Sequence, residues 1–495
     1  MALSIEKVAI ANRGEVAVRI IRACQELGLS TVLLHSEADR QSLAYRLCDE
    51  TVCIGPAEVG ASYLNIEANI QGALSVGADA IHPGFGFLSE NADFAEACAQ
   101  ARLVFVGPSP ESIRLFGDKI SAKRLVEEAG GPVIPGYQGE DQSLSGLLAK
   151  VEEIGYPVMV KAAAGGGGRG LKVIHKASQA QQAIEAAQRE GLSAFGSAQV
   201  FLEKYLAEAK HIEVQIFADH LGRIYHLFER ECSIQRRHQK IIEEALSPSL
   251  TEELRSRISQ AAVQIAEKSG YRGAGTIEFL LAPDGQFYFL EMNTRLQVEH
   301  PVTEMVLGVD LVKAQLLTAM GRSLGWDEEF VPRGHAMECR IYAEDPYRGG
   351  MPSTGPLGLC HWPQGPGRRF EVGFERGDEI TPYYDSMLAK VIVWDETRAR
   401  AISKMKCTLQ DTVVFGVQTN IPFLLALMEH PEFVSGEMTT AFVERYFSVP
   451  LSKPSLTRSD QLLAQEALKG ISPGEPPRSR SPWQHSWSSH KGGPS

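Results

Sequence analysis

Two glutamates are spaced so that they meet on one face of a predicted β-hairpin. Residues 275–293 form two runs of β-favouring side chains around Pro283-Asp284-Gly285, a composition typical of a tight turn. If the hairpin is symmetric about its Asp-Gly pair, Glu278 lies opposite Glu291, with Asn293 on the same face. A bulge or a three-residue loop would shift this register, so the pairing is a conditional prediction.

Facing carboxylates favour a bound cation. At about 5 Å they repel by roughly 3 kcal/mol at an effective dielectric constant of about 20, and a divalent ion between them removes that repulsion. Glu278, Glu291 and the amide oxygen of Asn293 are hard ligands, suited to Mg²⁺ or Mn²⁺ that also binds substrate phosphates. The alternative is two solvated glutamates on an exposed face, which the bulky apolar neighbours disfavour. The hairpin therefore predicts a metal–nucleotide site.

The segment after the hairpin supplies further reactive groups. Arg295, Gln297 and Glu299 add a cation, a neutral amide and a third carboxylate soon after Asn293. A lone Arg-x-x-x-Glu is ordinarily a surface ion pair, and only its position directly after the hairpin gives it significance. One segment would then hold an anion and a base beside the metal.

A glycine-rich loop offers a second phosphate-binding element. Gly165–Gly170 contains four consecutive glycines and then Arg169-Gly170, so backbone N–H groups are free to approach phosphate oxygens. No Gly-Lys-Ser/Thr follows, which excludes a Walker A loop. Lys161 ends the strand before the loop, and Lys119 begins a helix; both are candidate phosphate ligands. The alternatives are a flexible linker for the loop and a solvated side chain for Lys119.

A basic segment stands out in an acidic chain. Residues 229–240 include Arg230, Arg236, Arg237, His238 and Lys240. This pattern indicates either an anion site or a ladder of salt bridges, and the sequence leaves both open. Cys232 also lies in this segment, but nothing in its spacing indicates a nucleophile or a metal ligand.

The elements that position these groups begin with a βαβ unit. Lys7–Ala11 predicts a strand, Val16–Leu27 a helix that Gly28 ends, and Thr31–His35 a second strand parallel to the first. Leu103–Val106 predicts a further strand. We expect this first domain to span residues 1–115.

The rest of the chain divides at changes in composition. Helix Lys119–Ala129 and strand Tyr156–Lys161 begin a region of mixed strands and helices over 116–330, with a lid at about 133–205. A break near Val331–Gly334 precedes a region rich in short strands, 331–447. Residues 448–495 are rich in Pro, Ser, Gly and Arg, which predicts a disordered tail.

Composition excludes several classes of partner. Among 495 residues the net charge is −12, which argues against nucleic acid and anionic membranes. No apolar stretch reaches the roughly 18 residues that a membrane span needs, and charge interrupts any secretory signal at the N-terminus. The eight cysteines are scattered without metal-ligand spacing, so we expect a reduced, cytoplasmic protein.

Taken in order, these stretches resemble the biotin carboxylases, within the ATP-grasp superfamily. The resemblance implies an α/β and α+β multidomain fold: a Rossmann-like N-terminal domain, an ATP-grasp domain with a mobile glycine-rich lid, and a C-terminal biotin carboxylase domain. It covers about residues 5 to 447 and is carried by Ile10–Glu15, His82–Asn91, Gly165–Gly170, Glu203–Leu206, Arg230–Lys240, Glu291–Thr303 and Pro382–Met387.

The resemblance implies carboxylation of biotin N1′ by bicarbonate and ATP, through carboxyphosphate. Glu299 would be the base, and Arg340 would meet the ureido oxygen of biotin. The bicarbonate ligands would be Lys240, Arg295 and Val298. The magnesium ligands would be Glu278, Glu291 and Asn293, in agreement with the hairpin argument. ATP would contact Lys119, Lys161, Gly167, Gly168, Glu203, Lys204, Leu206, His211 and His238.

The resemblance also implies partners. The biotin-attachment sequence Ala-Met-Lys-Met is absent and the chain is short for a carboxyltransferase, so we expect a separate biotin carboxyl carrier protein and a separate carboxyltransferase subunit. The resemblance also implies a homodimer. The final acceptor stays open among acetyl-CoA, propionyl-CoA, methylcrotonyl-CoA and pyruvate. One departure is Phe85, where relatives more often carry tyrosine, and we expect a minor effect.

Two other functions compete with this interpretation. A carbamoyl-phosphate synthetase module also phosphorylates bicarbonate, but the segments around His82 and Tyr384 favour biotin. A catalytically inactive nucleotide-binding scaffold is the second alternative. The intact set of Glu278, Arg295 and Glu299 argues against it.

Overall fold

The first sheet along the chain is parallel, as the βαβ pattern predicts. The computed structural model describes residues 5–162, 171–326 and 329–453. Strand β1 (Lys7–Ile10), helix α1 (Gly14–Glu26) and strand β2 (Ser30–Ser36) form the predicted unit. The other elements of this region are β3 (Glu50–Gly55), β4 (Ala80–His82), β5 (Val104–Phe105), α2 (Leu43–Leu47), α3 (Ile66–Ser75), α4 (Ala92–Gln100) and α5 (Pro110–Gly117).

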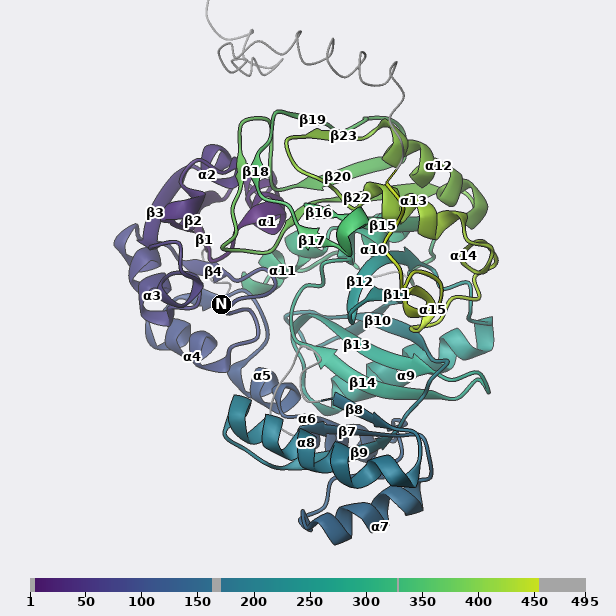
Figure 1. Ribbon diagram of the computed structural model, residues 1–495. Helices are drawn as coiled ribbons and strands as arrows, with labels where there is room; N and C mark the ends of the chain where they lie inside the picture. The colour runs from purple at the N-terminus through teal and green to yellow at the C-terminus, as the bar shows by residue number, and fades with distance from the viewer. Residues whose placement is uncertain (1–4, 163–170, 327–328, 454–495) are drawn as a thin grey trace, which may run out of the picture. The chain divides into compact units, whose positions relative to one another are not determined.

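The strand order of this sheet reverses at its centre. The order is β3-β2-β1-β4-β5, so the loops after β1 and β4 lie side by side at a switch point, where open α/β sheets bind ligands (Figure 1). The Nδ2 group of Asn12 donates to the carbonyl oxygens of Pro83 (2.7 Å) and Phe85 (2.8 Å). Gly84 has φ +63°, and a Cβ there would lie 2.9 Å from the Asn12 side chain. The segments beginning at Ile10 and His82 therefore form one structural unit.

An eight-stranded antiparallel sheet contains the hairpin and continues past residue 330. Its strands are β10 (Lys210–Ala218), β11 (Ile224–Arg236), β12 (Gln239–Ala245), β13 (Gly273–Leu281), β14 (Phe287–Asn293), β15 (His335–Tyr342), β20 (Arg368–Val372) and β22 (Met387–Asp395). The order β14-β13-β10-β11-β12-β15-β22-β20 joins β12 to β15, so the proposed domain boundary at 330 does not interrupt the sheet. Helices of this region are α9 (Glu252–Lys268), α10 (His300–Leu307) and α11 (Leu311–Ala319).

The hairpin has the predicted register where the carboxylates lie, but not at its turn. Glu278 pairs with Glu291, as expected. Beyond a bulge at Leu290, Phe279 pairs with Phe289, so the turn is centred on Asp284 and not between Asp284 and Gly285. The bulge and the loop compensate each other, and the two carboxylates still share one face.

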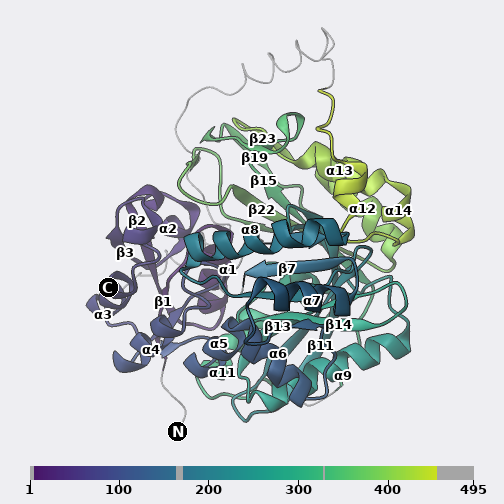
Figure 2. The same cartoon turned by 60° about the horizontal axis from the view of Figure 1, so that its bottom comes forward.

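A separate four-stranded sheet carries Lys161. Its order is β6-β9-β7-β8, and Figure 2 shows helices α7 and α8 beside β7. Val158 and Val160 pack under these helices, so Met159 and Lys161 face the opposite side. The glycine loop, including Gly167 and Gly168, lies outside the described residues. The elements are α6 (Lys119–Glu128), β6 (Gly136–Tyr137), α7 (Leu144–Ile154), β7 (Val158–Ala162), β8 (Leu171–Ile174), α8 (Ala177–Phe195) and β9 (Val200–Lys204).

The last region contains more helix than the sequence interpretation expected. Short strands occur to residue 415, but the expectation of a strand-rich region to 447 is wrong after residue 398. Ala401, Met405 and Leu409 recur at helical spacing and are buried, so tertiary packing supports a helix there. The elements are β16 (Glu344–Asp345), β17 (Met351–Pro352), β18 (Gly355–Pro356), β19 (Leu359–His361), β21 (Glu379–Ile380), β23 (Val413–Phe415), α12 (Arg398–Asp411), α13 (Ile421–Glu429), α14 (Pro431–Ser435) and α15 (Phe442–Tyr446).

Two further expectations concern the chain as a whole. Residues 454–495 of the predicted tail lie outside the described residues, so the disorder expected from 448 stays a prediction. Within the described ranges, no helix combines the length and apolar character that crossing a bilayer requires.

Candidate active site

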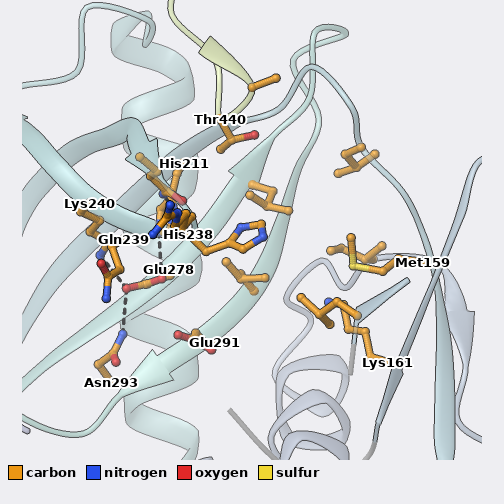
Figure 3. A pocket seen from close by; sticks show the side chains of 18 of the residues that line it. Met159, Lys161, His211, His238, Gln239, Lys240, Glu278, Glu291, Asn293 and Thr440 are labelled. Atoms are coloured by element: carbon orange, nitrogen blue, oxygen red, sulfur yellow. Dashed lines mark hydrogen bonds and ion pairs between the residues drawn. The ribbon is translucent and has the colours of Figure 1, made fainter. Parts of the chain in front are cut away.

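One cavity of about 620 Å³ lies between the hairpin and the β7 sheet. Figure 3 shows Met159 and Lys161 facing His211, His238 and Glu278 across it. Glu299 is buried just behind the cavity wall, bonded to two of the residues that line it. The predicted site residues that line the cavity are Lys119, Lys161, Glu203, Lys204, Leu206, His211, His238, Lys240, Glu278, Glu291, Asn293, Arg295, Val298 and Arg340.

Lys240 is the electrostatic centre of the hairpin side. Its ammonium contacts carboxylates from three different segments: Glu213 on β10, Glu278 on β13 (2.7 Å) and Glu299 (2.7 Å). Burial alone would lower the pKa of Lys240, but these three carboxylates raise it well above its ordinary value. The ammonium therefore stays charged and holds together acids that would otherwise repel.

Glu299 is ionised between two cations. Burial favours its neutral form, but Lys240 and then Arg340 outweigh that effect and hold the pKa of Glu299 well below its ordinary value. Arg340 donates from Nη2 to Glu299 (2.9 Å) and from Nε to Glu243 (2.6 Å). This carboxylate is therefore ionised and fixed in place.

The hairpin residues fit a divalent cation. Desolvation by the surrounding protein, and after it the Glu278 carboxylate, raise the pKa of Glu291, although its side chain is solvent-exposed. A cation beside the two carboxylates would favour their charged forms. Glu278 already accepts hydrogen bonds from Lys240 and from Nδ2 of Asn293 (2.8 Å). The amide oxygen of Asn293 accepts from Arg295 (2.8 Å), so it must turn toward the ion to serve as a ligand.

Arg295 is held by the N-terminal region. Its Nε donates to Oε2 of Glu90 (2.9 Å), and the other carboxylate oxygen of Glu90 accepts from the backbone N–H of Thr294 (3.0 Å). Nη1 donates to Gln297 (2.6 Å). Glu90 lies in the His82–Asn91 motif, and the sequence alone assigned it no role. It also missed Glu213 and Glu243, because the order of distant strands cannot be read from their spacing.

The side of the cavity formed by β7 is a lysine cluster around one acid. Lys161 and Lys123 each form an ion pair with Glu203. Burial, followed by repulsion from neighbouring lysines, lowers the pKa of Lys123 to about 7. Burial and then Lys119 lower the pKa of Lys161 to about 8. This cluster has more cations than anions, which suits a polyphosphate. Lys123 was not predicted.

The basic segment 229–240 contains both an internal ion-pair network and a residue that lines the cavity. Arg230 is fully buried and bonds to Glu213, Gln215 (2.8 Å) and Thr303 (2.9 Å), an internal ion-pair network. His238, at the turn between β11 and β12, instead lines the cavity and is exposed. Burial raises the pKa of the Cys232 thiol well above its ordinary value, which agrees with an unreactive cysteine.

Comparison with known families accounts for nearly the whole described chain. Residues 4–113 match the biotin carboxylase N-terminal domain, and 338–445 match the biotin carboxylase C-terminal domain. The intervening residues 118–326 match the ATP-binding domain of the carbamoyl-phosphate synthase L chain. The biotin carboxylase of Nostoc sp. is 50% identical over 443 residues, which cover 89% of this chain and 99% of that protein. This chain belongs to the biotin carboxylase family.

Two further relatives support this placement. The mitochondrial methylcrotonoyl-CoA carboxylase subunit alpha of Dictyostelium discoideum is 45% identical over 97% of this chain and 69% of its own length. A solved structure, the biotin carboxylase domain dimer of Hydrogenobacter thermophilus 2-oxoglutarate carboxylase with MgADP, ADP and bicarbonate, has TM-score 0.86 and 43% identity. That match covers 91% of this chain and all of that domain, 100%. As a family member, this chain is an ATP-grasp ligase that carboxylates biotin, using ATP, Mg²⁺ and bicarbonate.

Proposed function

We propose that Glu299 is the base that activates bicarbonate in this biotin carboxylase. The observation that carries the proposal is the ionised Glu299 carboxylate, held between Lys240 and Arg340 at the edge of the cavity. A carboxylate with a lowered pKa cannot hold a bicarbonate proton for long. Proton transfer must therefore accompany the attack of the bicarbonate oxygen on the γ-phosphorus of ATP, rather than precede it.

The remaining roles follow from charge and position. Lys240 and Arg295 bind bicarbonate with the backbone at Val298, and offset charge as ADP leaves and carboxyphosphate forms. Carboxyphosphate then breaks down to CO₂ and phosphate, phosphate takes the proton from biotin N1′, and the nitrogen attacks CO₂. Arg340 stabilises the negative charge on the ureido oxygen. Exclusion of water from the cavity protects the intermediate.

ATP lies between the two sides of the cavity in this proposal. The phosphates meet Lys119 and Lys161, and the rest of the nucleotide meets Glu203, Lys204, Leu206, His211 and His238. A magnesium ion held by Glu278, Glu291 and Asn293 would supply positive charge to the phosphates. The net positive lysine cluster and the repelling pair of glutamates support this division of roles.

We also propose protein partners, although the residues of this site do not identify them. The biotin would be attached to a biotin carboxyl carrier protein, and a carboxyltransferase would use the product. The acceptor stays open; the similarity to a methylcrotonoyl-CoA carboxylase subunit favours no single acyl-CoA. We infer a homodimer, as in the related dimeric structure. The eight cysteines are unpaired in the structure, and we infer a cytoplasmic location.

Glu299→Gln tests the central role. ATP cleavage that depends on both bicarbonate and free biotin should fall by about 100-fold or more, because a general base contributes 10²–10⁴-fold. The control is Glu253→Gln, an exposed glutamate on α9, which should behave as wild type. If Glu299→Gln keeps the wild-type rate, Glu299 is not the base. If the wild-type ATP cleavage ignores biotin, a bicarbonate kinase of another type is the better interpretation.

A further inference from the structure

The segment between β14 and α10 needs support from side chains. Residues 294–299 belong to neither the sheet nor the helix. The carbonyl oxygens of Gln297 and Glu299 accept long backbone hydrogen bonds from His300 (3.4 Å) and Val302 (3.3 Å). Val298 lies in this segment, and its backbone is the proposed bicarbonate contact. Two peptide planes flank Val298, and each has one carbonyl oxygen that a buried side chain can fix.

Lys390 holds the peptide plane between Val298 and Glu299. Its Nζ donates to the carbonyl oxygen of Val298 at 2.8 Å, and the lysine side chain is completely buried. Lys390 lies on β22 directly opposite Arg340 on β15, so both side chains project from the same face of the sheet. A buried ammonium reaching a single irregular carbonyl is a costly arrangement unless it is specifically compensated.

The compensation comes from the N-terminal region. Glu15, at the start of α1, approaches the ammonium of Lys390 at 3.2 Å, and its side chain is also buried. The ring of Phe85 lies under the same ammonium, with Nζ 5.8 Å from the ring centroid. Asn12 fixes the Phe85 loop, as described above. The two loops at the switch point of the parallel sheet thus converge on one lysine.

His300 holds the peptide plane between Gln297 and Val298. Its Nδ1 lies 2.7 Å from the carbonyl oxygen of Gln297. That carbonyl shares a peptide plane with the N–H of Val298. A carbonyl oxygen only accepts, so Nδ1 carries the proton and the imidazole is neutral, in line with burial lowering the pKa of His300 well below its ordinary value. The ring is buried, so its hold on the plane is rigid.

We propose that Lys390, with Glu15 as its counter-ion and His300 as the second support, is a positioning residue that orients the Val298 backbone toward bicarbonate. The inference rests on the proposed function, because it assumes that bicarbonate binds at Val298. It gives a role to the Asn12–Glu15 and His82–Phe85 loops, which do not line the cavity themselves. Bicarbonate affinity therefore depends on a contact between the N-terminal region and the large sheet.

Lys390→Met tests the inference in the full chain. Methionine keeps the length of the side chain but removes the donor. We expect the KM for bicarbonate to rise about tenfold, the effect of losing one charge-assisted hydrogen bond, while the KM for ATP stays within about twofold. The matched control is Lys404→Met. Lys404 donates to the carbonyl oxygen of Trp394 (2.8 Å) at the far end of β22, and its loss should leave both constants unchanged.

A second variant covers the case in which Lys390→Met fails to fold. Glu15→Gln with Lys390→Met removes both members of this ion pair. Another buried acid that interacts with Lys390 is Glu338, and burial holds its pKa well above its ordinary value, which favours its neutral form. The double variant should therefore fold and show the same rise in bicarbonate KM. An unchanged bicarbonate KM in either variant, or an equal rise in both constants, would overturn the inference. Failure of the proposed function looks different, because wild-type ATP cleavage would then not depend on bicarbonate and biotin.

Discussion

The two sides of the cavity use charge in opposite ways. On the hairpin side, cations and anions are matched: Lys240 contacts three carboxylates, and Arg340 bridges Glu299 and Glu243. On the side formed by β7, Lys123 and Lys161 share the single carboxylate of Glu203. The ion pairs of Lys240 and Arg340 are formed before substrate arrives, and Glu291 beside Glu278 would still take a cation, whereas the lysine side requires an anion to complete it. In the proposed mechanism, the preorganised groups serve the chemical step and the unmatched cations serve nucleotide binding.

Removal of Lys240 should have the largest effect, because it breaks the matched side at its centre. Lys240→Met removes the ammonium that three buried carboxylates share: Glu213 keeps Arg230 and Glu299 keeps Arg340, but Glu278 loses its lysine partner. The free energy of unfolding should therefore fall by about 3–5 kcal/mol, and ATP cleavage should be lost. Chemical denaturation and a steady-state assay measure the two effects. Lys268→Met, an exposed lysine on α9, is the control. Unchanged stability would mean that the hairpin side is not a matched network.

Removal of Lys161 should affect binding and not chemistry. Lys161→Gln should raise the KM for ATP about tenfold through loss of a charged phosphate contact, with kcat within about threefold and no loss of stability, because a repulsion with Lys119 is also removed. Lys172→Gln, on the neighbouring strand β8, serves as the control. A drop in kcat at constant KM would reverse the division of roles between the two sides.

The pH dependence of ATP binding sharpens the comparison. Burial and neighbouring lysines lower the pKa of Lys123 to about 7 and of Lys161 to about 8 in the free protein. Both lysines lose charge as the pH rises through these values, so ATP should bind less tightly at pH 9 than at pH 6.5, by a few fold. Calorimetric titration measures this, and Lys161→Gln should flatten the profile. An affinity that is constant over this range would show that the lysines stay charged.

Phe85→Tyr should have the smallest effect. The Phe85 ring already lies under the ammonium of Lys390, and a hydroxyl added at the ring edge leaves the ring face free to contact that ammonium. We expect biotin-dependent turnover within about threefold of wild type, since a change outside the reacting groups leaves the matched side intact. A change greater than about tenfold would show that this position acts directly on biotin.

The sequence predicted the chemistry better than the support around it. A hairpin symmetric about its Asp-Gly pair places Glu278 opposite Glu291, and the structure has that pair because a bulge offsets the shifted turn. The bulge at Leu290 was not predictable, because it depends on how the turn closes. Arg295 and Glu299 could be proposed from the sequence because they follow the hairpin directly along the chain.

The missed residues come from distant elements. Glu213, Glu243 and Lys390 reach the site from strands whose order in the sheet is set by tertiary pairing and not by sequence spacing. Helix α12 was missed because its buried positions were interpreted within a strand-rich region, although their spacing is helical. Site residues that come from different strands of a sheet are therefore the ones that a single sequence does not reveal.

A crystal structure of this protein with MgADP and bicarbonate tests the account most directly. We predict the metal between Glu278 and Glu291, the nucleotide against Lys161, and bicarbonate between Arg295, Lys240 and the Val298 backbone. A nucleotide bound elsewhere, or the two glutamates turned into bulk solvent away from the ion, would contradict the account.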